Sequence, residues 1–301
     1  MTPAKRPFRF AVQGGPFADP TALAEHARTV ESLGYAELWT ADHIGSVDPL
    51  APLLVAALAT EHLRVGPLVL NNELHHPALL ARTAATLDRL SGGRLTLGFG
   101  TGYQRSEHTA TGIELRPPGP RVSRLGESLA AVRTLLDTGA AHLDGEHHTL
   151  AIDDLGVRPV QAHVPFLIGG HGRRVVALAG RYADIFQFTG LAHAADGAIS
   201  IPGFDLGELE LRAAWLGEAA GDRDAEIERS ALVQALAVDG ALTNDFGLDA
   251  ATLAEVPFVL AGSVAQIIDK LERLREQLGI THYVVRDPEQ FAPVVAALAG
   301  R

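Results

Sequence analysis

Two polar residues, Asp42 and His43, follow closely on the apolar run ELWT of residues 37–40. Such a run predicts a buried strand, and an acid beside a histidine at the end of a strand is suited to proton chemistry. Histidine has a pKa of about 6.5 and can accept or donate a proton at neutral pH. His43 is therefore a candidate catalytic residue and Asp42 a candidate ligand-binding residue. A structural interpretation stays open, in which Asp42 caps the next turn and His43 is held by hydrogen bonds.

Glycines alternate with other residues in LTLGFGTGY, residues 95–103, where Gly98, Gly100 and Gly102 precede Tyr103. A dinucleotide-binding fingerprint would need a glycine in place of Tyr103, so the pattern does not favour a Rossmann fold. Two explanations remain. The glycines could let a planar ligand lie against the backbone, which makes Gly100 and Gly102 candidate cofactor-binding residues, or they could allow close packing followed by a turn.

A second glycine-rich segment, FLIGGHGRR at residues 166–174, joins a short apolar strand to an apolar helix. Free backbone amides at the start of a helix form an anion site, and nearby arginines strengthen it. We therefore predict a phosphate-binding turn, although glycines also occur in ordinary tight turns between a strand and a helix. The candidate cofactor-binding residues of this turn are Gly169, Gly170, Gly172 and Arg173, with Arg174 beside them.

The composition argues against several classes of site and partner. The chain has no cysteine, which excludes disulfides, thiolate nucleophiles and zinc thiolate sites. Its 25 basic and 36 acidic residues give a net charge of -11, which argues against nucleic acid or an anionic membrane as a partner. No His-x-His follows the first strand, FAVQGG, and there is no Gly-x-Ser-x-Gly motif, so we expect neither a metal site nor a serine nucleophile. A bound planar cofactor is expected to supply the chemistry.

Short apolar runs alternate with helical segments along the chain. Caps and glycines bound helices near 19–34, 263–279 and 287–298. Eight strand and helix units in 301 residues fit a single α/β domain over 1–301, a (β/α)8 TIM barrel with insertions at the carboxyl-terminal face of its strands. The candidate strands are 8–13, 36–40, 64–70, 94–99, 165–168, 183–188, 229–237 and 281–285, and the insertions are roughly 101–120, 139–158, 189–205 and 238–256.

The barrel prediction explains where the polar residues lie. Barrel enzymes carry their active sites at the carboxyl ends of the strands, which is where Asp42 and His43 stand. Lys5 and Arg6 are not followed by a long apolar segment, and no run of about 20 apolar residues occurs, so we expect a cytoplasmic protein.

The same segments resemble the luciferase-like monooxygenase superfamily and, within it, the branch that uses the deazaflavin coenzyme F-420. LGYAELWTADHI is similar to the family's second-strand signature, and LDRLSGGRLTLGFGTGYQRSE to its fourth-strand signature. RPVQAHVPFLIGGHGRRVVALAGRYADIF is similar to the block of its fifth and sixth strands, and GSVAQIIDKLERLREQLGITHYVV to its last helix and strand. The resemblance covers almost the full chain.

The resemblance implies an oxidoreductase that moves a hydride between coenzyme F-420 and a small-molecule substrate. The ring would lie in the mouth of the barrel beside Asp42 and His43, with its phosphate at the glycine turn. GPLVLNN is similar to a bulge behind the ring, where a cis peptide bond would join Leu68 to Val69 and both residues would bind the cofactor. Sugar-phosphate dehydrogenases of this branch carry a glutamate proton donor where Tyr103 stands, so their substrate is not carried over, and Tyr103 is a candidate hydrogen-bond donor in catalysis.

The alternatives concern the cofactor and the chemistry. A reduced-FMN monooxygenase on the same barrel would use FMN in place of F-420, and a metal-dependent hydrolase is less favoured. The resemblance alone implies a homodimer. The residues do not identify the substrate.

Overall fold

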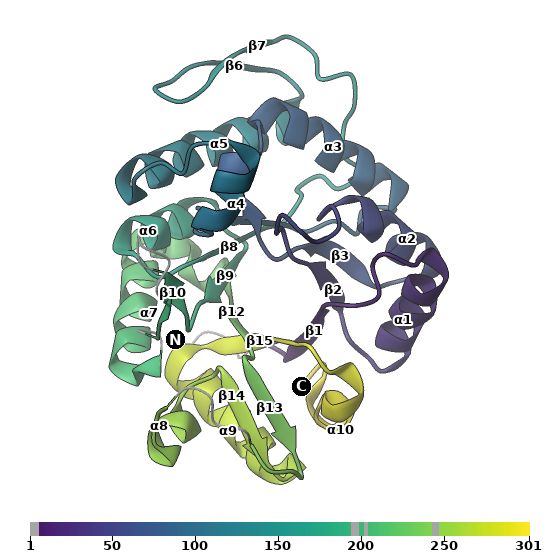
Figure 1. The fold of residues 1–301 in the computed structure, drawn as a ribbon, viewed down its shortest axis with the longest axis vertical. Helices are drawn as coiled ribbons and strands as arrows, with labels where there is room; N and C mark the ends of the chain where they lie inside the picture. The colour runs from purple at the N-terminus through teal and green to yellow at the C-terminus, as the bar shows by residue number, and fades with distance from the viewer. Residues whose placement is uncertain (1–5, 194–198, 202–203, 243–246) are drawn as a thin grey trace.

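The computed structural model describes residues 6–193, 199–201, 204–242 and 247–301. Nine parallel strands form one sheet that curls into a nearly closed barrel with helices on its outer face (Figure 1), as the sequence predicts for a TIM barrel. The strands follow one another around the barrel in the order β3 (Arg64–Pro67), β2 (Glu37–Thr40), β1 (Arg9–Gln13), β15 (Ile280–Val285), β12 (Glu228–Leu232), β9 (Ile185–Phe188), β8 (Phe166–Gly170), β5 (Leu97–Gly100) and β4 (Leu70–Asn71).

The third predicted strand, 64–70, is present in two pieces. β3 pairs with β2, β4 pairs with β5, and the peptide bond from Leu68 to Val69 between the two pieces is cis, which confirms the prediction. β3 and β4 are the two ends of the sheet but are consecutive in the chain, and Val65 also bridges Leu95. The ring of strands therefore nearly closes at this point.

Helices between the strands cover the outside of the barrel. Asp19 accepts hydrogen bonds from the first backbone amides of α1, and Ser263 forms a capping box at the start of α9, so both predicted caps are present. None of the helices in the described ranges is long and apolar enough to cross a membrane. The helices are α1 (Pro20–Ser32), α2 (Ala51–Ala59), α3 (Pro77–Leu90), α4 (Arg105–Thr111), α5 (Pro118–Thr138), α6 (Arg173–Tyr182), α7 (Leu206–Ala220), α8 (Ala250–Glu255), α9 (Val264–Leu278) and α10 (Pro288–Leu298), with 3-10 turns at Asn72–Leu74 and Gly221–Glu226.

The predicted insertions differ in where they leave the barrel. Segment 101–120 follows β5 and contains α4. Segment 139–158 follows α5 and forms a hairpin of β6 (Ala141–Asp144) and β7 (Thr149–Ile152). This segment therefore leaves the barrel after a helix, and the prediction that it is an insertion at the carboxyl end of a strand is wrong. Segment 189–205 contains the antiparallel pair β10 (Ala192–His193) and β11 (Ile199–Ser200), and 238–256 contains α8; parts of both lie outside the described residues.

The predicted strand 229–237 also divides. Its first part is β12 of the barrel, and its second part is β13 (Ala235–Val238), which pairs with β14 (Val259–Gly262) in a separate two-stranded sheet. This small sheet packs against α8 and α9 beside the barrel (Figure 1).

Inward-facing side chains fill the barrel in layers, since alternate residues of a strand face the same side. The amino-end layer consists of Arg9, Glu37, Glu228 and His282: Arg9 lies 2.6 Å from Glu37 and 3.0 Å from Glu228, and His282 lies 3.1 Å from Glu37. A small apolar cluster lies above it, made of Ala11, Trp39, Leu68, Leu167, Ile185 and Val284. Space for a ligand is left at the carboxyl ends of the strands.

Candidate active site

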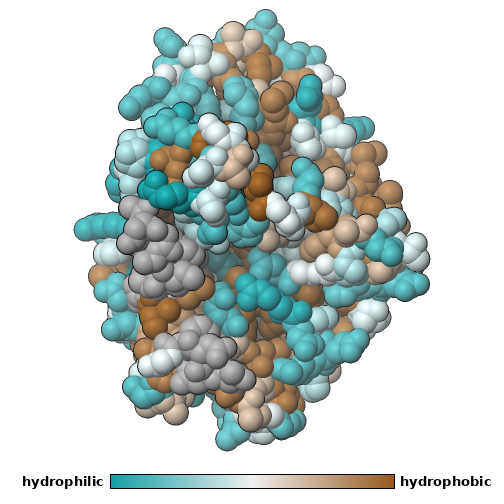
Figure 2. Space-filling view, viewed as in Figure 1, coloured by the Kyte–Doolittle hydropathy of each residue, from teal (hydrophilic) through white to brown (hydrophobic). Residues whose placement is uncertain are grey.

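A cavity of about 640 Å³ opens at the carboxyl ends of the barrel strands. This volume lies in the range that small molecules and cofactors occupy in proteins. Figure 2 shows this face hollowed near its centre, with hydrophilic side chains gathered around the hollow. Ten predicted site residues line the cavity, namely Asp42, His43, Leu68, Val69, Gly100, Gly102, Tyr103, Gly169, Gly170 and Gly172.

His43 lies at the cavity wall between two polar partners. Its Nδ1 is 2.7 Å from Glu107 Oε1, and its Nε2 is 3.5 Å from the phenolic oxygen of Tyr103. The Glu107 side chain on α4 is 8% exposed, and its carboxylate favours a proton on Nδ1. Nε2 is then the ring nitrogen that can accept a proton from a ligand, or donate one when the imidazole is protonated.

Tyr103 stands at the mouth of the cavity, with its ring edge-on to the imidazole of His43. Burial raises the pKa of Tyr103, and the negative charge of Glu107 raises it further. The phenol therefore keeps its proton at neutral pH and can donate a hydrogen bond.

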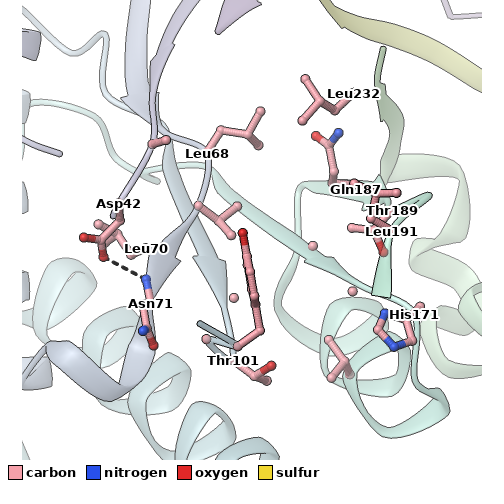
Figure 3. Close-up of a pocket in the computed structure, with 18 of the residues that line it drawn as sticks. Asp42, Leu68, Leu70, Asn71, Thr101, His171, Gln187, Thr189, Leu191 and Leu232 are labelled. Carbon is pink, nitrogen blue, oxygen red and sulfur yellow. Dashed lines mark hydrogen bonds between the residues drawn. The ribbon is translucent and has the colours of Figure 1, made fainter. Parts of the chain in front are cut away.

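Asp42 has a positioning role. Its Oδ2 accepts a hydrogen bond from the backbone N–H of Asn71 at 2.8 Å (Figure 3) and lies 2.8 Å from Nε2 of His75. These contacts join the end of β2 to β4 and to the turn that follows it. Asp42 lines the cavity, but its carboxylate is already engaged by the protein.

The glycines of β5 are required by packing. A Cβ at Gly98 would lie 2.1 Å from the carbonyl oxygen of Pro67, and one at Gly100 would lie 2.7 Å from a methyl group of Val69. Gly102 has a φ of +72°, and a Cβ there would overlap the side chain of Asn71. Of the two explanations offered by the sequence, close packing against the cis segment accounts for the alternation, even though Gly100 and Gly102 also line the cavity.

The turn between β8 and α6 is built differently. A Cβ at Gly172 would have no atom within 4 Å, and at Gly169 the nearest atom would be 3.6 Å away, so packing requires glycine at neither position. Gly170 differs, because a Cβ there would lie 2.5 Å from Val175. Among the described residues, no side chain caps the first turn of α6, and the amide of Val175 already donates to the carbonyl of Gly172. The amides of Arg173 and Arg174 are therefore the ones available beside the cavity.

Arg173 does not line the cavity, which corrects the sequence prediction. Arg173 is the first residue of α6, and its guanidinium points to the outer surface, where it lies 3.1 Å from Glu218 and faces the ring of Trp215. Arg174 also turns away, toward the carbonyl of Gly119 and the hydroxyl of Ser123. At the start of a helix the free N–H groups point along the axis, out of the amino-terminal end, whereas the side chains project sideways from it.

Three charged residues that line the cavity were missed by the sequence analysis. Arg121, near the start of α5, donates to the carbonyl of Gly102 at 2.5 Å. Glu107 lies in a segment predicted as an insertion, so nothing in the sequence placed it near His43. Arg286 directly follows β15, just as Asp42 and His43 follow β2, so the same position at a strand end could have identified it.

Other histidines of the chain are engaged by neighbouring side chains. His75 pairs with Asp42, and Nε2 of His148 lies 3.0 Å from the hydroxyl of Ser128. Burial lowers the pKa of His148 to about 4. Within the described ranges, no three His, Cys, Asp or Glu residues come together in a way that could hold a metal ion.

Comparison with known proteins identifies relatives that cover more than nine-tenths of the chain. The 5,10-methylenetetrahydromethanopterin reductase of Methanopyrus kandleri is 25% identical over 93% of this chain and 92% of its own length. The structure of an F-420-dependent secondary alcohol dehydrogenase in complex with an F-420-acetone adduct matches with a TM-score of 0.78 and 20% identity, covering 97% of this chain and 99% of that one. The oxygenating constituent of a Pseudomonas putida 3,6-diketocamphane monooxygenase in complex with FMN matches with a TM-score of 0.70 and 16% identity, covering 98% of each chain.

The solved structures share the barrel fold with this chain, and a family model gives the assignment. The model described as luciferase-like monooxygenase matches residues 6–208, which is more than half of the chain. This span contains the candidate site from the first strand through the turn at Gly169–Gly172, including both His43 and Glu107. The chain therefore belongs to the luciferase-like monooxygenase family, as the sequence resemblance indicates.

Proposed function

We propose that this protein is an oxidoreductase that transfers a hydride between coenzyme F-420 and a small organic substrate. The observation that carries the proposal is the pair of His43 and Glu107, which places a proton donor and acceptor at the wall of a large cavity. Hydride transfer to a carbonyl carbon needs such a group, because the oxygen gains a proton as the carbon gains the hydride. The relatives named as a methylenetetrahydromethanopterin reductase and as an F-420-dependent alcohol dehydrogenase support it.

The cavity fits a flat ring with an anionic tail. The backbone at Leu68 and Val69 would support the ring. The open space at Gly169 and Gly172, beside the amides that begin α6, is a cradle that a side chain would fill. These amides and the guanidinium of Arg121 would hold the anionic tail.

The bound deazaflavin would supply the hydride chemistry, since the side chains that line the cavity have no redox chemistry of their own. The residues of the chain would manage the proton. His43 Nε2 would give a proton to the substrate oxygen or take one from it, and Glu107 would stabilise the imidazolium form. Tyr103 would donate a hydrogen bond to the same oxygen.

A reduced-FMN-dependent monooxygenase is the second candidate, favoured by the fold shared with the FMN complex of the camphane monooxygenase. The two candidates differ in the cofactor they bind. Titrating the protein with F-420 and with FMN, each oxidised and reduced, and following absorbance and fluorescence tests them directly. We expect binding of F-420, and tight binding of FMN with no binding of F-420 would contradict the proposal.

The glycine turn offers a sharper test. Gly172→Glu places a negative charge in open space, so we expect the variant to fold normally and to bind F-420 at least about tenfold more weakly. Gly172→Gln is the matched control, because it adds nearly the same volume without the charge. Equal losses of affinity in the two variants would show that bulk, and not repulsion of an anion, weakens binding.

A further inference from the structure

Arg286 lines the cavity and has no task in the reaction proposed above. It follows the last strand, and because side chains alternate it shares the inward side of β15 with Val284, which packs inside the barrel. Its Nε donates to Gln13 Oε1 at 3.2 Å, and its Nη1 lies 3.4 Å from Gln234 Oε1. Both partners are neutral amides, so they orient the guanidinium without neutralising it.

Around the cavity, the carboxylates have partners that can carry the opposite charge, whereas Arg286 hydrogen-bonds to neutral partners. Each of the two carboxylates that line the cavity has a histidine partner. Asp42 lies 2.8 Å from His75, and Glu107 lies 2.7 Å from His43. In the described part of the chain, no carboxylate lies within 4.0 Å of the guanidinium of Arg286. Arginine stays charged at any physiological pH, so this guanidinium favours an anionic ligand.

The surroundings of Arg286 connect it with the proton-transfer groups. Tyr103 and Arg286 both line this cavity. The positive charge of Arg286 opposes the rise in the pKa of Tyr103 that burial causes. Tyr103 in turn contacts His43. A ligand held by Arg286 would thus extend toward the pair of His43 and Tyr103. The other arginine of the cavity lining, Arg121, donates to the backbone carbonyl of Gly102.

We propose that Arg286 binds a carboxylate group of the substrate, so that the substrates are small organic acids. The guanidinium has five N–H groups, of which the two glutamines engage two, and both N–H groups of Nη2 remain for an anion. A planar guanidinium matches a carboxylate in both charge and geometry. The assignment of this acid as the substrate rests on the proposed function, whereas the binding of the carboxylate does not.

Calorimetric titration with acetate, benzoate, benzamide and phenylphosphate tests this inference, using protein with and without bound F-420. We expect benzoate to bind and benzamide, which has the same shape without the charge, to bind at least about tenfold more weakly. Arg286→Gln should reduce the affinity for benzoate at least about tenfold, and Arg286→Lys should retain part of it. Arg28→Gln on the outer face of α1 removes the same charge and should leave the affinity unchanged. Thermal melting confirms that each variant is folded.

Several results would overturn the inference. These are no binding of acetate or benzoate, equal affinity for benzoate and benzamide, or an unchanged affinity for benzoate in Arg286→Gln. Tighter binding of phenylphosphate than of benzoate would replace the carboxylate with a phosphate, and a loss of F-420 affinity in Arg286→Gln would assign the residue to the cofactor. If the protein binds no F-420 at all, the proposed function fails, and titration of the unloaded protein still decides the role of Arg286.

Discussion

Charged side chains lie at both ends of the barrel interior, but they are paired in different ways. In the amino-end layer, the carboxylate of Glu37 is 1% exposed and is surrounded by the cations Arg9 and Arg64 and by His282. At the carboxyl ends, the cavity contains Arg286, whose hydrogen-bond partners are the neutral amides of two glutamines, and the imidazole of His43 with one nitrogen directed to the ligand space.

The difference indicates what each end contributes. A buried charge that loses its partner destabilises the fold strongly, so a mutually neutralised layer holds the strands together. Charges that retain free hydrogen-bonding capacity beside a cavity are available to a ligand. We therefore expect substitutions in the amino-end layer to change stability, and substitutions around the cavity to change binding and turnover.

The largest effect is expected for Glu37→Gln. Loss of this carboxylate leaves His282 without its acidic partner and Arg9 with Glu228 alone, at a cost of about 3 kcal/mol in the free energy of unfolding. Urea denaturation measures this loss. Glu228→Gln is the control from the same layer and should cost less, because Glu228 is paired with Arg9 at the edge of the network. A variant of Glu37 with normal stability and reduced turnover would break the comparison.

The lowered pKa of Glu37 also predicts how the free energy of unfolding depends on pH. Burial favours its neutral form, but Arg9 and His282 overcome this and lower the pKa of Glu37 from 4.5 to about 2. A group whose pKa is lower in the folded state contributes stability above its unfolded pKa and loses it as the pH falls through its folded pKa. The stability difference between the natural chain and Glu37→Gln should therefore shrink between pH 4.5 and about 2, by roughly 2 kcal/mol. A constant difference over this range would contradict the assignment.

At the carboxyl ends, His43→Ala should act on turnover. Removal of a general acid or base costs about 100-fold in kcat, whereas the affinity for F-420 and the melting temperature should change little. Steady-state kinetics and cofactor titration separate these quantities. An unchanged kcat would remove the proposed role of His43 in proton transfer.

Glu107→Gln should have a smaller effect, because it acts through His43. An amide keeps the volume and can still hold the imidazole, but it does not stabilise the protonated form, so we expect kcat to fall about tenfold with little change in KM. A rise in KM with normal kcat would instead place Glu107 in contact with the substrate.

The fold followed from the sequence because each barrel strand is an apolar run bounded by helix caps and glycines, as at Asp19 and Ser263. The break in the third strand required the family resemblance, since nothing in GPLVLNN shows on its own that the bond from Leu68 to Val69 is cis. The division of 229–237 was missed because β12 and β13 are nearly continuous in sequence, although they belong to different sheets.

The candidate site was predictable where position along a strand determines direction, and less so elsewhere. Asp42 and His43 follow a strand and could be assigned to the cavity from that position alone. Glu107 is 64 residues from His43 and lies on a helix inside an insertion, so their contact depends on tertiary structure. The side-chain direction of Arg173 depends on how α6 packs, which the glycine pattern does not reveal.

The smallest effect is expected for Arg173→Ala, and it sharpens the contrast at the glycine turn. The Arg173 side chain is 65% exposed and pairs with an exposed Glu218, and such surface pairs contribute about 0–1 kcal/mol to stability. Because this guanidinium lies on the outer surface, F-420 affinity should change less than about twofold, whereas Arg121→Ala should weaken binding about tenfold. Cofactor titration of the two variants compares an arginine that lines the cavity with one that faces the outer surface. A larger loss for Arg173 would mean that the anionic tail extends over the outer surface of α6 and leaves the cavity near Gly172.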